Sequence, residues 1–172
     1  MVSRYEGPEL LEPGHDTTEF ECGSPAQTTW LRKYALAAQQ VGTSRVYVVR
    51  RPSEQRVVGY HALAAAAIGH NEASAGIKAG LPRYPIPATL LTRLGVDVSE
   101  QGRGLGKALV VDAIRRTIAA AGEVGAVALL VHAESREARE FYLHLAEFEE
   151  SPSDPLHLMI RIGALQRTLH VE

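Results

Sequence analysis

The feature that most constrains this chain is a glycine-rich stretch, Gln101-Gly102-Arg103-Gly104-Leu105-Gly106, which lies between an apolar segment (90–98) and an amphipathic one (105–121). Alternating glycines allow backbone conformations that other residues avoid, and they let main-chain N–H groups approach a ligand closely. A helix that begins at Leu105 would present unpaired N–H groups and a positive dipole end, which favour a phosphate. Arg103 and Lys107 add positive charge. The stretch therefore predicts a strand, an anion-binding turn and a helix.

Two familiar phosphate-binding loops do not fit this turn. A P-loop has Ser or Thr after its Gly-Lys pair, whereas Ala108 follows Gly106-Lys107. A dinucleotide-binding fingerprint has two residues between its second and third glycines, whereas only Leu105 separates Gly104 from Gly106. The glycine turn is therefore neither a P-loop nor a dinucleotide-binding loop.

Length and composition predict one globular domain, residues 1–172, since 172 residues with 45% hydrophobic content suffice for a sizeable core. Cys22 is the only cysteine, which excludes an internal disulfide and a Cys-pair zinc site and points to a reducing compartment. The N-terminus lacks a basic-then-apolar signal pattern, and no apolar run approaches the ~20 residues of a membrane span. We therefore expect a cytoplasmic protein without membrane association.

The net charge of −2 is unevenly distributed along the chain. Residues 1–22 carry six acidic side chains against Arg4, a balance of −5, which leaves +3 on the remainder. A mildly basic body is compatible with a polyanionic partner, although a solvated surface explains +3 equally well. The acidic segment 1–22 also contains Pro8, Pro13 and Gly14, and we interpret it as an irregular lead-in.

Hydrophobic periodicity predicts the order of the remaining elements. A first helix begins with Thr28 or Thr29 as N-cap, Ser135 caps a later helix, and Gly122 ends the helix that follows the glycine turn. The residues from 69 to 87 have loop composition, and 163–172 form a short tail. The expected strands are 46–50, 57–64, 90–98, 126–131 and 156–162, and the later helices are 105–121 and 137–147.

The glycine turn resembles the acyl-CoA pyrophosphate loop of the GNAT N-acetyltransferases, whose pattern Gln/Arg-x-x-Gly-x-Gly/Ala is matched by Gln101, Gly104 and Gly106. The order of elements is similar to the GNAT fold over nearly the whole chain. That resemblance implies an α/β protein with a central mixed, mostly antiparallel twisted sheet, which is flanked by helices and has a β-bulge and a V-shaped splay at the acetyl-CoA site. It also implies that acetyl-CoA is the acetyl donor and that no metal is needed. The implied cofactor-binding residues are Val96 and Val98, through their main chain, and Gln101, Gly102, Arg103, Gly104, Gly106 and Lys107.

Further motifs narrow the resemblance to the GNAT toxins of bacterial toxin–antitoxin pairs. These motifs are Arg93-Leu94-Gly95-Val96-Asp97, Leu130-Val131-His132-Ala133, Ala138-Arg139-Glu140-Phe141-Tyr142 and Ser153-Asp154-Pro155-Leu156. Such toxins acetylate the free α-amino group of aminoacyl-tRNA and so block translation. The resemblance implies the same substrate here, together with a ribbon-helix-helix antitoxin and a homodimer. Thr28-Thr29 stand where such toxins often have an acidic residue.

By the same resemblance Tyr142 is the general acid that protonates the departing CoA thiolate; the alternative is that Phe141-Tyr142 only packs its helix onto the sheet. An α-amino group has a pKa of about 7.7–8.0, so a strong general base is unnecessary. Candidate bases near predicted strand ends, each more simply a solvated loop residue, are Asp97, Glu100, His132 and Glu134. Candidate tRNA contacts, each equally a surface charge, are Arg32, Lys33, Arg83 and Arg93.

Two other functions remain compatible with the sequence. The first is a GNAT enzyme that acetylates a small amine or a protein N-terminus, which the modest charge of the body favours. The second is a module that binds CoA without catalysis. A variant that replaces Tyr142 by Phe separates catalysis from mere binding.

Overall fold

The computed structural model describes residues 4–170, apart from the side chain of His170, and the chain divides into two compact units. The first unit contains the residues up to Ala64 together with Thr92–Ala113. The second contains Ala65–Leu91 together with the residues from Ile114 onwards.

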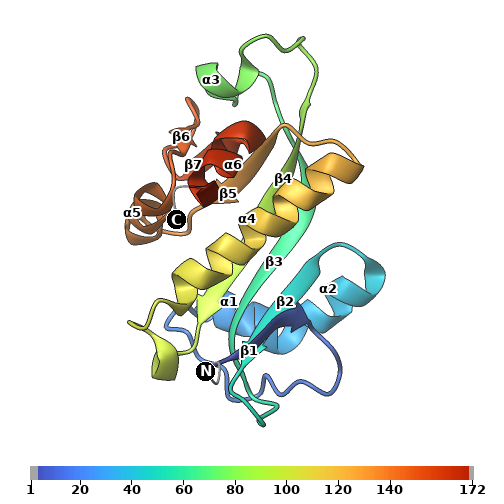
Figure 1. Cartoon of the computed structure of the whole chain (residues 1–172), viewed down its shortest axis with the longest axis vertical. Helices are drawn as coiled ribbons and strands as arrows, with labels where there is room; N and C mark the ends of the chain where they lie inside the picture. The colour runs from blue at the N-terminus through green and yellow to red at the C-terminus, as the bar shows by residue number, and fades with distance from the viewer. Residues whose placement is uncertain (1–3, 171–172) are drawn as a thin grey trace. The chain divides into compact units, whose positions relative to one another are not determined.

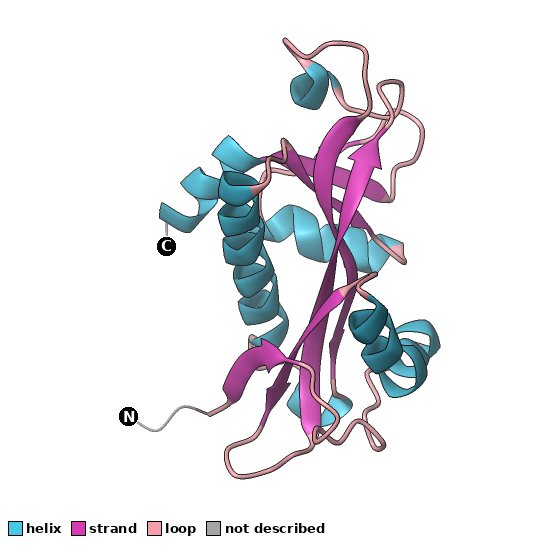
Figure 2. Cartoon of the chain, turned by 90° about the vertical axis from the view of Figure 1, so that its right-hand side faces the viewer, coloured by secondary structure: helices cyan, strands magenta, loops and turns pink. Residues whose placement is uncertain are grey.

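Seven strands are hydrogen-bonded in the order β1-β2-β3-β4-β5-β7-β6 (Figures 1 and 2). Strand β4 pairs with β5 in parallel, whereas β1–β2, β2–β3, β5–β7 and β6–β7 are antiparallel. This confirms the mixed, mostly antiparallel sheet with helices, whereas the bulge and the splay at the cofactor site stay predictions. The strands are β1 (Glu6–Leu10), β2 (Arg45–Arg50), β3 (Val57–Ile68), β4 (Ile86–Val96), β5 (Ala128–His132), β6 (Glu149–Glu150) and β7 (His157–Arg161).

Helical elements separate most of these strands along the chain, although β2 leads directly into β3 and β6 into β7 (Figure 1). Those near the N-terminus form one continuous segment, α1 (Pro25–Thr29), the π-helical turn η1 (Trp30–Tyr34) and α2 (Ala35–Val41). The others are α3 (Ala75–Lys78), the 3₁₀ turn η2 (Val98–Glu100), α4 (Leu105–Glu123), α5 (Arg136–Leu145) and α6 (Ile162–His170).

In the first unit, the helical segment packs beside β2 and β3 (Figure 2). Leu31 and Ala35 are buried against Val46, Val48 and other strand residues. The segment starts earlier than predicted, because Ser24 rather than Thr28 or Thr29 is the N-cap: its hydroxyl accepts a hydrogen bond from the amide of Gln27. A proline follows at the first helical position, where its missing N–H costs nothing.

The expectation of an irregular lead-in is wrong for Glu6–Leu10, which forms β1 at the edge of the sheet beside β2. The Arg50 side chain explains how such an acidic segment is held there. Its guanidinium lies 2.6 Å from the carboxylate of Glu6 and 2.7 Å from that of Glu9. The acidic charge that indicated an irregular segment is thus compensated by the neighbouring strand.

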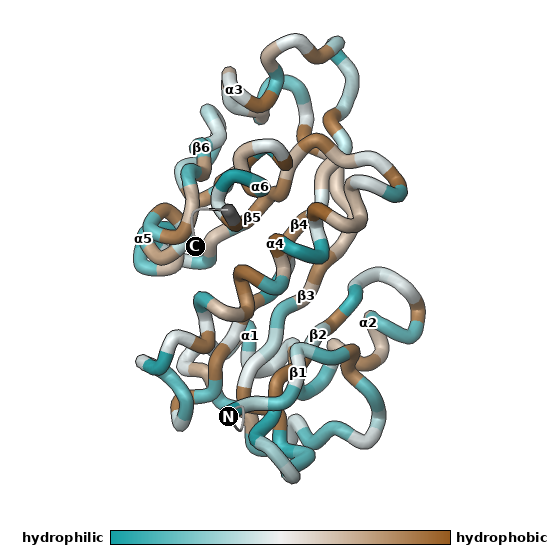
Figure 3. Tube along the Cα trace, viewed as in Figure 1, coloured by the Kyte–Doolittle hydropathy of each residue, from teal (hydrophilic) through white to brown (hydrophobic). Residues whose placement is uncertain are grey.

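In the second unit, β4 and β5 pair in parallel from Ala88↔Ala128 to Leu91↔Val131, and β5 confirms the strand predicted at 126–131. The apolar run of β5, brown in Figure 3, is buried as expected of a strand covered on both faces. Ser135 caps α5, as predicted, by accepting a hydrogen bond from the amide of Ala138.

The second unit also departs from the predictions at the loop, the tail and one helix end. The loop 69–87 contains α3, whose last turn is held by Arg161, since that guanidinium donates to the carbonyls of Gly76, Ile77 and Ala79. The tail forms α6, in which Leu165 is fully buried. Helix α4 continues through Gly122 to Glu123, and Gly125, with φ of +95°, follows its end in the left-handed region.

Candidate active site

The glycine turn has the backbone that its sequence predicts. Gly102 and Gly104 have φ of +77° and +82°, in the left-handed region that side chains disfavour. The amide of Ala108 donates to the carbonyl of Gly104 at 3.1 Å, so α4 begins at Leu105. The first amides of α4 therefore face out of the helix end at the turn, where an anion is favoured.

Gln101 fixes the turn to the rest of the first unit. Its side-chain amide donates to the carbonyls of Cys22 and Val96, each at 2.9 Å. These two bonds tie the start of the turn to the end of β4 and to the segment that precedes α1. Gln101 is thus placed as a residue that positions the loop.

The strand that leads into the turn ends two residues earlier than predicted, at Val96. Val98 lies instead in η2, and its N–H donates to the carbonyl of Glu21 at 2.8 Å. The cause is Asp97, whose carboxylate accepts the amide of Ser99 and so starts a tight turn. The placement of Val98 on the strand is therefore wrong, and its N–H is already used within the protein.

Asp97 is one of two buried carboxylates beneath the turn. Its two oxygens accept hydrogen bonds from the amide of Glu21 at 3.0 Å and from the hydroxyl of Ser99 at 2.6 Å, and Arg56 lies 3.4 Å away. Burial by itself would raise the pKa of Asp97, but the hydrogen bonds and Arg56 outweigh it and hold the pKa below its usual range. The carboxylate is thus ionised and fully engaged, which makes it a poor general base.

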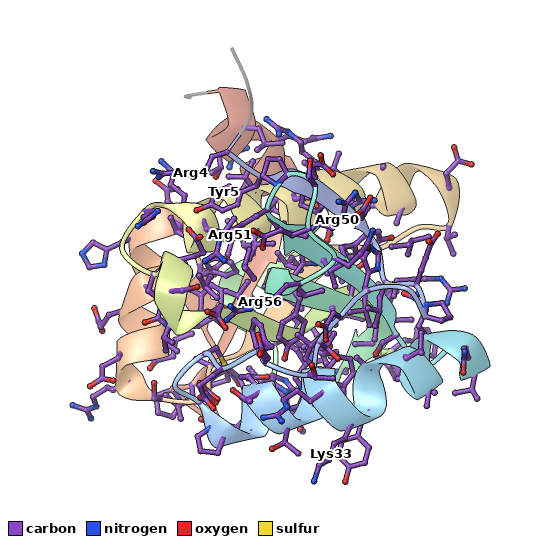
Figure 4. The ribbon with its side chains drawn as sticks, turned by 90° about the horizontal axis from the view of Figure 1, so that it is seen from below. Arg4, Tyr5, Lys33, Arg50, Arg51 and Arg56 are labelled. Carbon is purple, nitrogen blue, oxygen red and sulfur yellow. The ribbon has the colours of Figure 1, made fainter. Side chains whose placement is uncertain are left out.

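Glu100, the second buried carboxylate, accepts the hydroxyl of Tyr5 and the Nε–H of Arg51, both at 2.7 Å. These bonds lower the pKa of Glu100, the Tyr5 bond most, although burial opposes them. Arg103 from the turn itself lies 3.5 Å from the same carboxylate. Figure 4 labels Tyr5, Arg51 and Arg56 around this part of the first unit. Sequence reasoning missed these three residues, because they lie 41 or more positions from the carboxylates that they bind.

Tyr142 lies in the second unit, on the α5 helix that Ser135 caps. The side chain is buried, and its ring makes edge contacts with Phe141 at 5.3 Å and with Phe148 at 6.1 Å between centroids. Burial, with a smaller effect of the negative charge of Glu134, raises the pKa of Tyr142 well above its usual value. Within the described part of the chain, the Tyr142 hydroxyl has no hydrogen-bond partner. The group is therefore a protonated phenol, able to donate to a bound ligand.

His132 borders a cavity of about 150 Å³ in the second unit. Its ring stacks on that of His157, with centroids 3.9 Å apart, at the cross-strand pair of β5 and β7. Burial, and then the neighbouring His157, lower the pKa of His132, so its imidazole is neutral at cellular pH. Glu72 and Ser151 also line this cavity.

The candidate tRNA contacts are divided between the units. Arg32 and Lys33 are exposed on η1 in the first unit, and Arg93 lies on β4 with its guanidinium over the ring of Trp30. Arg83 is exposed in the loop before β4, in the second unit. The structure thus places three of the four candidates in one unit.

The described residues, 4–170, contain neither a membrane-spanning helix nor a cluster of metal-binding side chains. No helix in residues 4–170 is long and apolar enough to cross a bilayer. No three His, Cys, Asp or Glu side chains in that range gather in a way that would hold a metal ion.

Comparison with known proteins gives the chain its family. No family model matches it. A curated relative, the "tRNA-acetylating toxin" of Mycobacterium tuberculosis, is 46% identical over 159 residues, which cover 92% of this chain and 93% of the relative. The chain therefore belongs to the family of the tRNA-acetylating toxins.

Similarity to solved structures supports this family assignment. AtaT complexed with acetyl-methionyl-tRNAfMet has a TM-score of 0.85 and 26% identity, and the match covers 94% of this chain and 97% of AtaT. A tyrosine-to-phenylalanine mutant of AtaT bound to acetyl-CoA and to the C-terminus of the antitoxin AtaR has a TM-score of 0.79 and 24% identity, over 95% and 97% of the two chains. The fold is thus the fold of GNAT toxins.

The left-handed conformation of Gly104 gives a first prediction. A Cβ at Gly104 would meet no atom within 4 Å, so Gly104→Ala should act through the backbone alone. The strain of about 1–2 kcal/mol should shift the turn and raise the KM for acetyl-CoA roughly 5- to 30-fold in steady-state assays. Gly122→Ala is the control: it lies inside α4, without a positive φ and with open space, and should leave KM unchanged. Equal KM values for both variants would contradict a role of the turn in binding.

Proposed function

We propose that this protein transfers the acetyl group of acetyl-CoA to the α-amino group of aminoacyl-tRNA and thereby acts as a toxin that blocks translation. The observation that carries the proposal is the glycine turn at the start of α4, in a chain 46% identical to a tRNA-acetylating toxin. The proposal includes a cytoplasmic homodimer and a ribbon-helix-helix antitoxin that neutralises it. AtaT, which shares the fold, has been solved with an antitoxin segment bound.

The turn supplies the groups that would hold the pyrophosphate of acetyl-CoA. The amides at the start of α4 and the positive end of the helix favour its negative charge. Gly102, Gly104 and Gly106 let the backbone come close, and Arg103 and Lys107 contribute charge. The main chain of Val96 would contact the pantetheine arm, whereas the N–H of Val98 is already bonded to the carbonyl of Glu21.

Tyr142 supplies the proton for the departing sulfur. The neutral amine attacks the thioester carbonyl and the carbon–sulfur bond breaks, while the Tyr142 hydroxyl gives its proton to the thiolate. The nitrogen, now cationic, returns a proton to the tyrosinate, so acetylated amine and free CoA thiol are formed with no net change at Tyr142. Its raised pKa keeps the hydroxyl protonated before each turnover, so position rather than acidity makes it useful.

The remaining titratable candidates are not needed as bases in this scheme. Asp97 and Glu100 are ionised and bonded within the first unit, where they hold the turn. The substrate amine has a pKa of about 7.7–8.0 and is partly neutral at cellular pH without help.

A transfer assay tests the proposal. Purified protein is incubated with labelled acetyl-CoA and total charged tRNA, with deacylated tRNA as the control. Label on charged tRNA alone is expected. Label on neither RNA, with acetyl-CoA binding confirmed, would overturn the substrate and favour a small amine or a protein N-terminus as acceptor. If the protein binds acetyl-CoA but transfers the acetyl group to no amine, it would be a module that binds CoA without catalysis.

The pH dependence of the reaction follows from the two proton-transfer groups. The value of kcat/KM should rise about tenfold per pH unit below the amine pKa of about 7.7–8.0, because only the neutral amine attacks. It should then stay level up to pH 10, since burial raises the pKa of Tyr142 and keeps the donor protonated. Initial rates at subsaturating tRNA measure the profile. A decline centred between pH 9 and pH 10 would mean that the donor has an ordinary phenol pKa.

A further inference from the structure

Trp30 is part of an ordered stack in the first unit. The guanidinium carbon of Arg93 lies 5.4 Å from the centroid of the Trp30 ring, and the Tyr60 ring stacks on Trp30 at 6.1 Å with an interplanar angle of 13°. Gln27 ties the partners together: its side-chain oxygen accepts from Arg93 at 3.4 Å and its main-chain oxygen accepts the Tyr60 hydroxyl at 2.7 Å. The planar guanidinium of Arg93 is thus held in place above an aromatic ring, and we call this pair the Arg93–Trp30 stack.

The charge of this stack is not compensated by acidic side chains. Arg50, Arg51 and Arg56 in the same unit each form ion pairs with carboxylates. Within residues 4–170, Arg93 has no carboxylate partner, and the same holds for Arg32 and Lys33 on η1. An uncompensated cation on an aromatic ring, with two more cations on the same helical turn as that ring, favours a ligand with both negative charge and flat rings.

The helix that carries Trp30 is irregular at this point. The amide of Ala35 donates to the carbonyl of Trp30, five residues back, which makes η1 a π-helical turn. π-Helical turns are rare in proteins, and those that occur are often found at functional sites. The turn carries Arg32 and Lys33 as well as Tyr34, whose side chain is 58% exposed. Figure 4 shows Lys33 projecting away from this helical segment.

The stack and the glycine turn belong to opposite faces of β4. A Cβ at Gly95 would meet Tyr60 and Phe20, and Arg93, two residues earlier, shares that face by the alternation of a strand. Leu94 and Val96 pack instead with Leu105 and Leu109 of α4. A ligand on the Arg93–Trp30 stack would therefore lie on the other face of β4 from a phosphate held at the start of α4. The stack is thus free to bind the acetyl acceptor rather than the donor.

We propose that the Arg93–Trp30 stack binds the single-stranded 3′ end of the tRNA: one base stacks on the Arg93 guanidinium, and Arg32 and Lys33 contact the flanking phosphates. Unpaired RNA bases are commonly bound on aromatic rings and arginine planes, and backbone phosphates by Arg and Lys. The inference rests on the proposed function and deepens it by naming the group that orients the acceptor.

Fluorescence tests this assignment directly, because Trp30 is the only tryptophan of the chain. The full-length protein is titrated with an acceptor-stem minihelix that ends in single-stranded CCA, with the same minihelix lacking that end, and with coenzyme A. Quenching by the first RNA alone is expected. Equal quenching by both RNAs, or quenching by coenzyme A alone, would overturn the proposal, the latter by assigning the stack to the adenine of the donor.

Steady-state kinetics give an independent readout. Arg93→Lys keeps the charge and removes the plane, so the KM for aminoacyl-tRNA should rise about tenfold while the KM for acetyl-CoA stays unchanged. Arg115→Lys, at an exposed position of α4, is the matched control and should change neither constant. An unchanged KM for tRNA in Arg93→Lys would contradict the stack. If no charged tRNA is acetylated at all, the proposed function fails, and the fluorescence titration still decides whether the stack binds RNA.

Discussion

Replacing Tyr142 by phenylalanine should lower kcat by about 10²- to 10⁴-fold, because the general acid is lost. Only one oxygen is removed, and the ring contacts with Phe141 and Phe148 remain. Within the described residues no protein hydrogen bond is lost, since the hydroxyl has no partner there. The affinity for acetyl-CoA and the thermal midpoint should therefore stay near their wild-type values.

Single-turnover kinetics at saturating substrates measure this effect, and binding of acetyl-CoA is measured in parallel. Tyr84→Phe is the matched control, because Tyr84 is 72% exposed in the loop before β4 and its variant should keep its kcat. A Tyr142→Phe enzyme with wild-type kcat would mean that Tyr142 only packs its helix. If the affinity for acetyl-CoA fell by as large a factor as kcat, the Tyr142 hydroxyl would contribute to binding of acetyl-CoA rather than to proton transfer.

The second large effect is expected at Asp97. Asp97→Ala should lower the free energy of unfolding by about 2–3 kcal/mol, because it removes the buried carboxylate that accepts from the amides of Glu21 and Ser99 and pairs with Arg56. Denaturant unfolding measures the change. Glu54→Gln is the control, since Glu54 forms only an exposed pair with Arg51 at 3.7 Å and should cost less than about 1 kcal/mol. Similar losses in both variants would contradict a structural role of the buried carboxylate.

The same carboxylate gives a pH dependence of stability. Because the pKa of folded Asp97 lies below its unfolded value of about 3.9, its contribution is fully present above that value and is lost as the pH falls towards the folded pKa. Glu100 acts in the same direction from about 4.3 downwards. Stability measured by urea unfolding should thus fall below about pH 4, and Asp97→Asn should flatten that part of the curve.

The sequence predicted best the features that depend on neighbouring residues. The glycine turn, the Ser135 cap and the buried run of β5 are each determined within a few positions, and the structure confirms all three. The order of the elements, predicted from hydrophobic periodicity, resembles that of the GNAT toxins, and the comparisons confirm this family relationship.

The features that escaped prediction depend on partners far along the chain. Glu6–Leu10 has an acidic composition that indicates an irregular segment, whereas its backbone pairs with β2 and Arg50 of that strand compensates its charge. The sequence offers Asp97 and Glu100 as candidate bases near strand ends, whereas Tyr5 and Arg56, 41 or more positions away, engage their carboxylates. The apolar run that includes Val98 predicts a strand there, but Asp97 turns the backbone before it.

The most direct test of the central claim is the chemical identity of the product. Charged tRNA is treated with the protein and acetyl-CoA, digested with a nuclease that releases the terminal aminoacyl-adenosine, and analysed by mass spectrometry with fragmentation. We predict one added acetyl group on the α-nitrogen of the aminoacyl moiety, formed about 10²- to 10⁴-fold more slowly when Tyr142→Phe replaces the wild type. An acetyl group on a nucleobase or a ribose, or an unmodified aminoacyl-adenosine with active enzyme and bound acetyl-CoA, would contradict the account.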